Sequence, residues 1–192
     1  MNKKTTHFLT MVIVGMLLLP IVSPAQEPKP PTTSQEQEMN QRNTVPKNFT
    51  TEIIVSNEED RKKAEWLIAM YQSLTNNPTI EGVRKYLRDD YIQHSPMLPD
   101  GPQGLAMFFH GICTDYPFAI DVHRVMVLGD WAMCHVNFRN MLNAAPDDLG
   151  MSAVDIYLFG PDGKLAEHWD AVQGVPAYST NSHGMFLRVR KD

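Results

Sequence analysis

The spacing of the hydrophobic residues changes near Phe118, and this change limits the possible folds more than any other feature of the chain. Before Phe118, apolar residues recur at intervals of three or four, which is typical of helices that bury one face. After it, apolar and polar residues alternate, and Gly129-Asp130 and residues 161–163 provide two short turns of the kind that join antiparallel strands. Helices followed by an antiparallel meander predict an α+β domain whose helices cover one face of the sheet.

Three helical segments are expected before the sheet. Ser56 and Glu59 form a capping-box pattern that begins the first helix, and Asn77-Pro78 ends it and starts the second. Residues 89–104 are loop-like, and a short third helix follows them. The apolar faces of the second and third helices are formed by Ile80, Val83 and Leu87 and by Leu105, Phe108, Phe109 and Ile112. A curved antiparallel sheet around three short helices leaves a cone-shaped hollow, open at one end, that suits a ligand.

The N-terminal segment predicts export. Two lysines precede the apolar run Phe8–Val22, and the small residues Ser23 and Ala25 match a signal-peptidase site, so residues 1–25 are expected to be a cleaved signal peptide. An uncleaved membrane anchor is the alternative, although the apolar run is shorter than the ~20 residues that span a bilayer. The mature protein is therefore expected to be periplasmic or secreted, with no membrane span.

The rest of the chain divides into a linker, one domain and a tail. Residues 26–48 are rich in Pro, Gln, Thr and Glu, which predicts a disordered linker. Residues 49–180 are expected to form the folded domain, and residues 181–192 a C-terminal tail. The 192-residue chain has a formal net charge of −5 and no basic cluster in its folded part, which argues against nucleic acid as a partner.

The two cysteines leave a choice between a disulfide and free thiols. An oxidising compartment would permit a bond between Cys113 and Cys134. Cys113 lies in a helix-like run and Cys134 in the middle of a strand among apolar neighbours. These positions favour two buried free thiols, and sequence alone does not give the distance between the two residues.

One histidine and two aspartates are expected to meet at the last hairpin. His168 and Asp170 are two positions apart in a strand, so their side chains lie on the same face. Asp155 lies about as far before the turn as these residues lie after it, which makes it their cross-strand neighbour. A poorly solvated carboxylate in the hollow would suit a group that takes up and returns a proton, so all three are candidate catalytic residues. The alternatives are a structural Asp170 at a loop or arginine, a backbone-bonded His168 and an exposed Asp155.

Further residues are candidates for contact with a substrate. His94 stands just before Ser95, whose backbone Pro96 restricts to an extended conformation, so the direction of this segment is fixed. His135 shares a strand face with other large side chains and is a second candidate. Met97 and Phe108 would give the hollow an adaptable apolar wall, or they could be ordinary core residues.

Neither a metal nor another cofactor is expected. His94, His135, His168 and Asp170 could in principle supply three ligands and leave one open position. However, no His-x-x-x-His or comparable short spacing supports a metal site. A Gly-x-Ser-x-Gly elbow for nucleophilic catalysis is also missing from the sequence.

Three stretches resemble a known family. "DDYIQHSPMLPDGPQGL", "VHRVMVLGDWAMCHV" and "AVDIYLFGPDGKLAEHWDAVQ" together are similar to the SnoaL-like polyketide-cyclase branch of the nuclear-transport-factor-2-like superfamily. The similarity covers roughly Ala64 to Val175. The motifs at Gln93–Pro96 and Glu167–Asp170 carry it through their order and spacing rather than singly. The resemblance implies an α+β cone with helices packed in a curved sheet, in agreement with the periodicity.

The resemblance also implies an activity and an assembly. Related cyclases close a ring by intramolecular aldol condensation without metal or nucleotide, and Asp170 stands at the position of their acid/base aspartate. Members often form homodimers through the outward face of the sheet, where Trp169 is expected to point. Export does not suit a narrow polyketide-cyclase role, since ring closure normally accompanies a cytoplasmic synthase.

Two functions therefore remain open. The first is a cofactor-independent cyclase, isomerase or lyase that moves a proton next to the carbonyl group of a small hydrophobic compound. The second is a module that binds a small molecule or peptide in the same hollow without turnover, because this scaffold hosts both kinds of protein.

Overall fold

The computed structural model describes residues 49–76, 78–178 and 183–190. The expected signal peptide and linker lie outside these residues, as do parts of the C-terminal segment. The described chain contains three helices and one six-stranded sheet, so the expected α+β class is confirmed. None of the described helices is long and apolar enough to cross a membrane.

Four antiparallel strands form the centre of the sheet. They are β3 (Ala119–Leu128), β4 (Trp131–Arg139), β5 (Met151–Phe159) and β6 (Leu165–Gly174), and each pairs with the next. Gly129, with φ of 62°, takes the left-handed conformation that the tight β3–β4 turn requires. The β5–β6 connection contains the expected turn at residues 161–163, so both predicted hairpins are confirmed.

Both edges of the sheet carry a strand that the sequence analysis did not predict. Strand β1 (Glu52–Ile54) pairs in parallel with β3, and β2 (Leu87–Gln93) pairs in parallel with β6. Residues 94–100 form a loop as predicted, but residues 89–93 belong to β2 and residues 101–104 to a helix. The prediction that Leu87 belongs to a helix is wrong, because it begins β2. Two consecutive aspartates interrupt the apolar alternation of β2, and an edge strand tolerates such charged residues on its solvent side.

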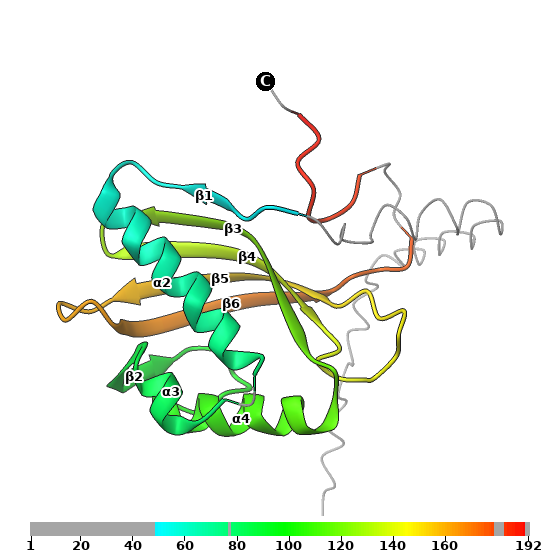
Figure 1. The fold of residues 1–192 in the computed structure, drawn as a ribbon, viewed down its shortest axis with the longest axis horizontal. Helices are drawn as coiled ribbons and strands as arrows, with labels where there is room; N and C mark the ends of the chain where they lie inside the picture. The colour runs from blue at the N-terminus through cyan, green and yellow to red at the C-terminus, as the bar shows by residue number, and fades with distance from the viewer. Residues whose placement is uncertain (1–48, 77, 179–182, 191–192) are drawn as a thin grey trace, which may run out of the picture. The chain divides into compact units, whose positions relative to one another are not determined.

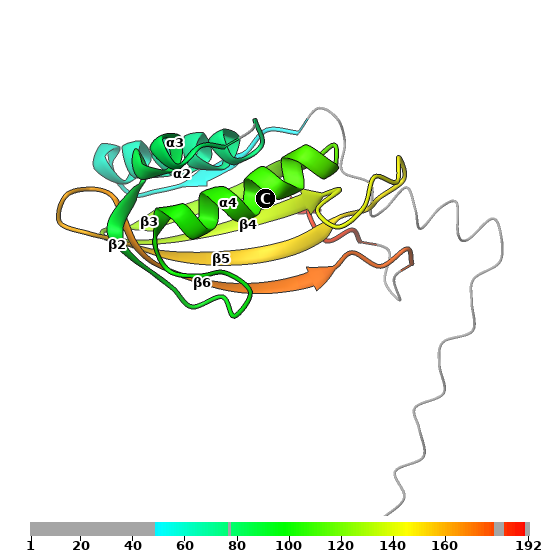
Figure 2. The same ribbon diagram turned by 90° about the horizontal axis from the view of Figure 1, so that it is seen from below.

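The helices lie on one side of the curved sheet (Figures 1 and 2). They are α2 (Glu58–Leu74), α3 (Ile80–Arg84) and α4 (Gly101–Asp115). Helix α2 is capped one residue later than predicted: Asn57 Oδ1 accepts from the Asp60 amide at 2.8 Å, and the Asp60 carboxylate accepts from Asn57 Nδ2 at 2.9 Å. Helix α4 is longer than expected, because Pro102 lies within its first turn, where a missing N–H costs no hydrogen bond.

The hydrophobic core fills the space between the helices and the inner face of the sheet. Alternation in the strands turns Cys134 inward, and it is fully buried. Cys113 on α4 is half-buried, and its thiol donates to the Leu74 carbonyl at 3.3 Å. Both cysteines are free, as favoured, and only Cys134 is fully buried.

Part of the C-terminal segment packs on the outer face of the sheet. Phe186 is 3% exposed and stacks on His123 and His135, with ring centroids 4.6 and 5.4 Å apart. Its carbonyl accepts a hydrogen bond from Arg124 at 2.8 Å. The described part of the expected tail, residues 183–190, is thus in contact with the domain through Phe186.

Candidate active site

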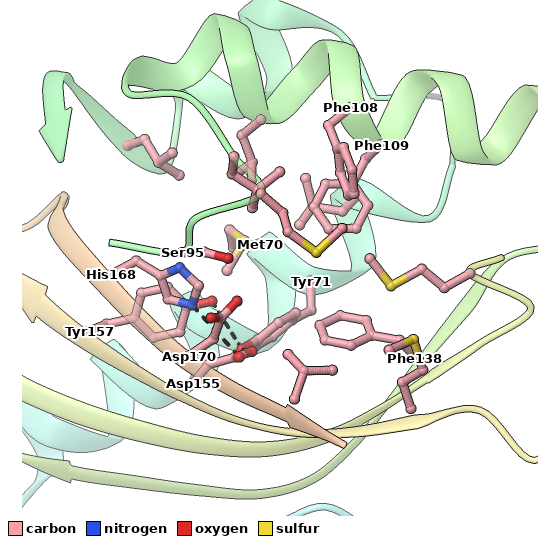
Figure 3. Close-up of a pocket in the computed structure, with 18 of the residues that line it drawn as sticks. Met70, Tyr71, Ser95, Phe108, Phe109, Phe138, Asp155, Tyr157, His168 and Asp170 are labelled. Atoms are coloured by element: carbon pink, nitrogen blue, oxygen red, sulfur yellow. Dashed lines mark hydrogen bonds and ion pairs between the residues drawn. The ribbon is translucent and has the colours of Figure 1, made fainter. Parts of the chain in front are cut away.

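A cavity of about 400 Å³ lies between the helices and the inner face of the sheet. Its polar groups are gathered at one end, where Tyr71, Asp155, Tyr157, His168 and Asp170 meet (Figure 3). Helix α4 and the neighbouring segments supply the apolar remainder. The apolar lining includes Leu74, Leu98, Leu105, Phe108, Phe109, Phe138, Met141 and Met151. Such a division suits a ligand with one polar end and an apolar body.

The last hairpin positions the central cluster. Asp155 on β5 and Asp170 on β6 are direct cross-strand partners, and His168 pairs with Tyr157 one step along the same face. One ligand atom from each of Asp155, His168 and Asp170 lies within 4.8 Å of the others, and His168 Nε2 is 3.6 Å from Asp155 Oδ1. Asp155 is 2% and His168 6% exposed, whereas Asp170 is half-buried and faces the cavity. The structure therefore brings together the three residues that the sequence singled out.

Two tyrosines support Asp155: Tyr71 from helix α2 directly, and Tyr157 from strand β5 through Tyr71. The Tyr71 hydroxyl donates a short hydrogen bond to Asp155 Oδ2, and the Tyr157 hydroxyl donates to the Tyr71 oxygen at 3.0 Å. Burial, and then the negative charge of Asp155, raise the pKa of both tyrosines well above the usual value. Both hydroxyls therefore keep their protons at physiological pH, so Tyr71 remains a hydrogen-bond donor to Asp155.

Tyr91 and Ser95 bring two more hydroxyls to the wall of the cavity. Burial raises the pKa of Tyr91, and the charges of Asp155 and Asp170 raise it further, so this phenol is also a proton donor near the cluster. Ser95 lines the same cavity as His168 and Asp170 (Figure 3). These hydroxyls lie where a ligand oxygen at the polar end could accept from them.

His168 has a hydrogen-bonding partner at Nδ1, the ring nitrogen other than the one nearest Asp155. Its Nδ1 lies 2.8 Å from Oε1 of Gln93, the residue that pairs with it from the edge strand β2. The Tyr157 ring stacks on the imidazole with centroids 4.6 Å apart. The ring is thus held from two sides, and Nε2 is directed toward Asp155.

Two residues that were expected to contact the substrate lie outside the cavity. Alternation along β2 turns Gln93 inward and His94 outward, where His94 stacks on Trp169 at 4.4 Å and pairs with Glu167 at 3.0 Å. His135 also points outward, because the β4–β5 register turns its neighbour Cys134 toward the cavity side. Trp169 is on the outer face as expected.

The two apolar candidates do line the cavity. Met97 is 72% exposed, as expected for a residue at the mouth, and Phe108 contributes from helix α4. The sequence analysis missed Tyr71, Tyr91 and Gln93 as members of the site. A signal for Tyr71 was its phenol on an otherwise apolar helix face, since a buried tyrosine hydroxyl needs a hydrogen-bonding partner.

The cluster also has the composition of a cation site. Asp155, His168 and Asp170 offer two carboxylates and one imidazole, which suit a divalent transition metal. One oxygen of Asp155 is already engaged by Tyr71, so a cation would have to use the other oxygen or displace this bond. The expected absence of a metal stays a prediction.

The sequence profile of the SnoaL-like polyketide cyclases matches residues 65–179, more than half of the chain. The protein belongs to this family. Among solved structures, this SnoaL-like chain is similar to a proposed polyketide cyclase from Bacillus cereus ATCC 10987, with 14% identity and a TM-score of 0.53 over 67% of this chain and 89% of that one. It is also similar to a nuclear-transport-factor-2-like protein of unknown function from Mesorhizobium loti, with 14% identity and a TM-score of 0.50 over 63% of this chain and 99% of that one.

These two structural similarities show the fold alone, because the identities are low. The expected cone of the nuclear-transport-factor-2-like superfamily is thereby confirmed. No curated protein sequence matches this chain significantly.

Proposed function

We propose that this SnoaL-like protein is an acid/base enzyme that moves a proton next to the carbonyl group of a small apolar compound, without a bound cofactor. One observation carries the proposal: Asp155, His168 and Asp170 meet at the polar end of an otherwise apolar cavity. Titratable groups in such surroundings are costly to bury, and they concentrate at functional sites. Ring closure, isomerisation and lyase chemistry all need this proton transfer.

The two carboxylates have different roles in the proposal. Asp155 is buried and engaged by Tyr71, so its charge is fixed at the back of the site. Asp170 lines the same cavity and is the more exposed of the two carboxylates, so it is the one assigned to contact a substrate. Asp170 removes the proton from the carbon next to the carbonyl and later returns it, while His168 and Asp155 orient and tune it. Tyr91 and Ser95 stabilise the negative oxygen that forms in between.

The walls favour a compound that is mostly apolar. A volume of about 400 Å³ is typical of small-molecule sites. Methionines at Met70, Met97, Met141 and Met151 give flexible side chains around the body of the ligand. A substrate with one carbonyl group at the polar end and an apolar remainder fits this arrangement.

Location and assembly complete the proposal. Cleavage after Ala25 would place the reaction in the periplasm or outside the cell. The outer sheet face carries Trp131, which is 51% exposed, beside Ile156 and Trp169, and an apolar face of this kind suits a homodimer. Sedimentation at low protein concentration tests this assembly, and a monomer alone would refute it.

The catalytic proposal is tested with Asp170→Asn and a panel of β-keto esters and enones. We expect the rate to fall at least ~100-fold, because a positioned acid/base group contributes about that much or more. Asp147→Asn, in an exposed loop, is the matched control and is expected to keep the wild-type rate. Equal turnover by Asp170→Asn would remove Asp170 from the mechanism. Binding of panel compounds, or of a co-purifying ligand found by mass spectrometry, without any turnover would favour the binding module.

A further inference from the structure

The side-chain amide of Gln93 bridges two groups behind the site. Its Oε1 lies 3.1 Å from the backbone nitrogen of Ser95 and 2.8 Å from His168 Nδ1. Gln93 does not line the cavity, so it can act on a substrate only through His168. In the Gln93–Pro96 motif, the histidine points away from the site, and it is the glutamine that contacts His168.

The Ser95 contact fixes the orientation of the amide. A backbone N–H only donates, so the Gln93 atom that faces it must be the carbonyl oxygen rather than the NH₂ group. The same oxygen faces His168 Nδ1, and an oxygen in this position only accepts. His168 Nδ1 must therefore carry the hydrogen.

The consequence appears at the other ring nitrogen. In a neutral imidazole only one nitrogen is protonated, so Nε2 of His168 carries a lone pair. Nε2 is buried, has no hydrogen-bond partner among the residues that the structure describes, and lies 3.6 Å from Asp155 Oδ1. The tautomer with hydrogen on Nε2 would instead let His168 donate to Asp155. The contact of Gln93 excludes that arrangement.

We propose that Gln93 is a positioning residue that holds His168 in the Nδ1–H tautomer, so that Nε2 faces the two carboxylates as a proton acceptor. The inference rests on the proposed function and adds the proton path. When Asp170 takes the proton from the carbon next to the carbonyl, the C–H bond breaks and its electron pair stays on the substrate as an enolate. The carboxyl proton can then be shared with Nε2, and it returns through Asp170 to the product. No other reactant is needed.

The groups that face His168 suit a ring nitrogen that accepts a proton during the reaction. Asp155 and Asp170 each place a carboxylate oxygen within 4.8 Å of a His168 ring nitrogen, and no lysine or arginine lines the described part of the cavity. A proton on Nε2 would thus be stabilised by negative charge, as in a charge-assisted pair. The stacked Tyr157 and the bond to Gln93 keep the ring from rotating.

The tautomer is tested directly by ¹⁵N NMR of the purified, ¹⁵N-histidine-labelled protein at neutral pH. The ring signals of His168 are assigned by their loss in His168→Asn. We expect a protonated Nδ1 and an unprotonated Nε2. A hydrogen on Nε2 in the wild-type protein would overturn the inference, and this measurement does not depend on any variant or substrate.

Two matched variants then separate positioning from structure. Gln93→Met keeps the size but removes the acceptor, and we expect the hydrogen to move to Nε2 and kcat to fall about 10-fold or more with little change in KM. Gln93→Glu restores an acceptor and is expected to keep the Nδ1–H signal. An unchanged tautomer in folded Gln93→Met would refute the role of Gln93. The expected tautomers without turnover of any panel compound would instead refute the proposed function and leave the positioning role intact.

Discussion

His168 and His135 lie on opposite faces of the same sheet, and their partners give them opposite properties. Both ring nitrogens of His135 are occupied: Nδ1 lies 3.0 Å from Arg124 Nη1, and Nε2 lies 3.1 Å from Ser152 Oγ. Because a guanidinium only donates, the hydrogen of neutral His135 must be on Nε2. His168 has its hydrogen on Nδ1 and keeps the other nitrogen for the carboxylates. The neighbour that fixes the first nitrogen thus decides what the second can do.

The charged groups around the histidines also differ between the two faces. On the outer face, burial and then Arg124 lower the pKa of His135, and burial lowers the pKa of His123 to about 4. These two histidines are therefore neutral at physiological pH and act as packing groups around Phe186. On the inner face His168 meets two carboxylates instead. The comparison shows that one residue type on one sheet serves packing or proton transfer according to its neighbours.

The largest effect is expected from Tyr71→Phe, which removes the hydroxyl that donates to Asp155 on the inner face. The change leaves a buried carboxylate oxygen of Asp155 without its donor, which costs about 2–3 kcal/mol of unfolding free energy. The rate is expected to fall roughly 100-fold, since a donor that fixes charge in the site is lost. Chemical denaturation and kinetics measure the two effects.

Tyr157→Phe is expected to have a weaker effect than Tyr71→Phe, because it removes only an indirect support of Asp155. The Tyr157 hydroxyl bonds only to Tyr71 among the contacts of the described chain, so its loss should be milder in both measurements. The exposed Tyr178→Phe should change neither. Equal and small effects of all three substitutions would contradict the view that tyrosines hold Asp155.

The inner cluster could be predicted from sequence, whereas the positions of His94 and His135 could not. Alternation and a short hairpin fix the shared face of Asp155, His168 and Asp170, and these are local properties. Which face receives His135 depends on the side that the helices cover, and the large residues on both sides of β4 hide this. His94 was misplaced because strand β2, which ends at the residue before it, was taken for a loop.

The supporting residues were missed for a different reason. Tyr71 bonds to Asp155 across 84 positions of sequence, and Gln93 bonds to His168 across 75. Such contacts arise only when a helix or an edge strand is packed on the hairpin. No local pattern names such a distant partner: the phenol of Tyr71 on an apolar helix face signals only that a partner is needed.

A smaller effect, on stability alone, tests the outer face. His123 has a folded pKa of about 4, below the usual 6.5, so acid protonates the unfolded chain first. Stability is therefore expected to fall by about 2–3 kcal/mol as the pH drops from 6.5 to 4, and to be fully present well above 6.5. The neighbouring charges modify the pKa of His123: Asp121 raises it, whereas His135 and Arg124 lower it further. The pKa of His135 is itself lowered, so His135 makes stability depend on pH in the same direction.

The check is denaturation of wild type and His123→Phe between pH 4 and 7. The variant should lose part of the slope in this range, because the unfolded chain then has one histidine fewer to protonate. His110→Gln, on the exposed side of α4, is the control and should keep the wild-type slope. An identical slope in wild type and His123→Phe would mean that His123 takes up its proton equally well in both states.

The smallest effect is expected from His94→Gln, and it sharpens the comparison between the two faces most directly. The pair of His94 with Glu167 is partly exposed, with side chains 39% and 29% accessible, and such pairs contribute about 0–1 kcal/mol. Stacking on Trp169 is lost as well, so stability should fall by about 1 kcal/mol at most, and the rate should stay at the wild-type value. His168→Gln should remove most of the activity. If His94→Gln reduced the rate as strongly as His168→Gln, the outer face would take part in the reaction and the division of the sheet into a catalytic and a packing face would fail.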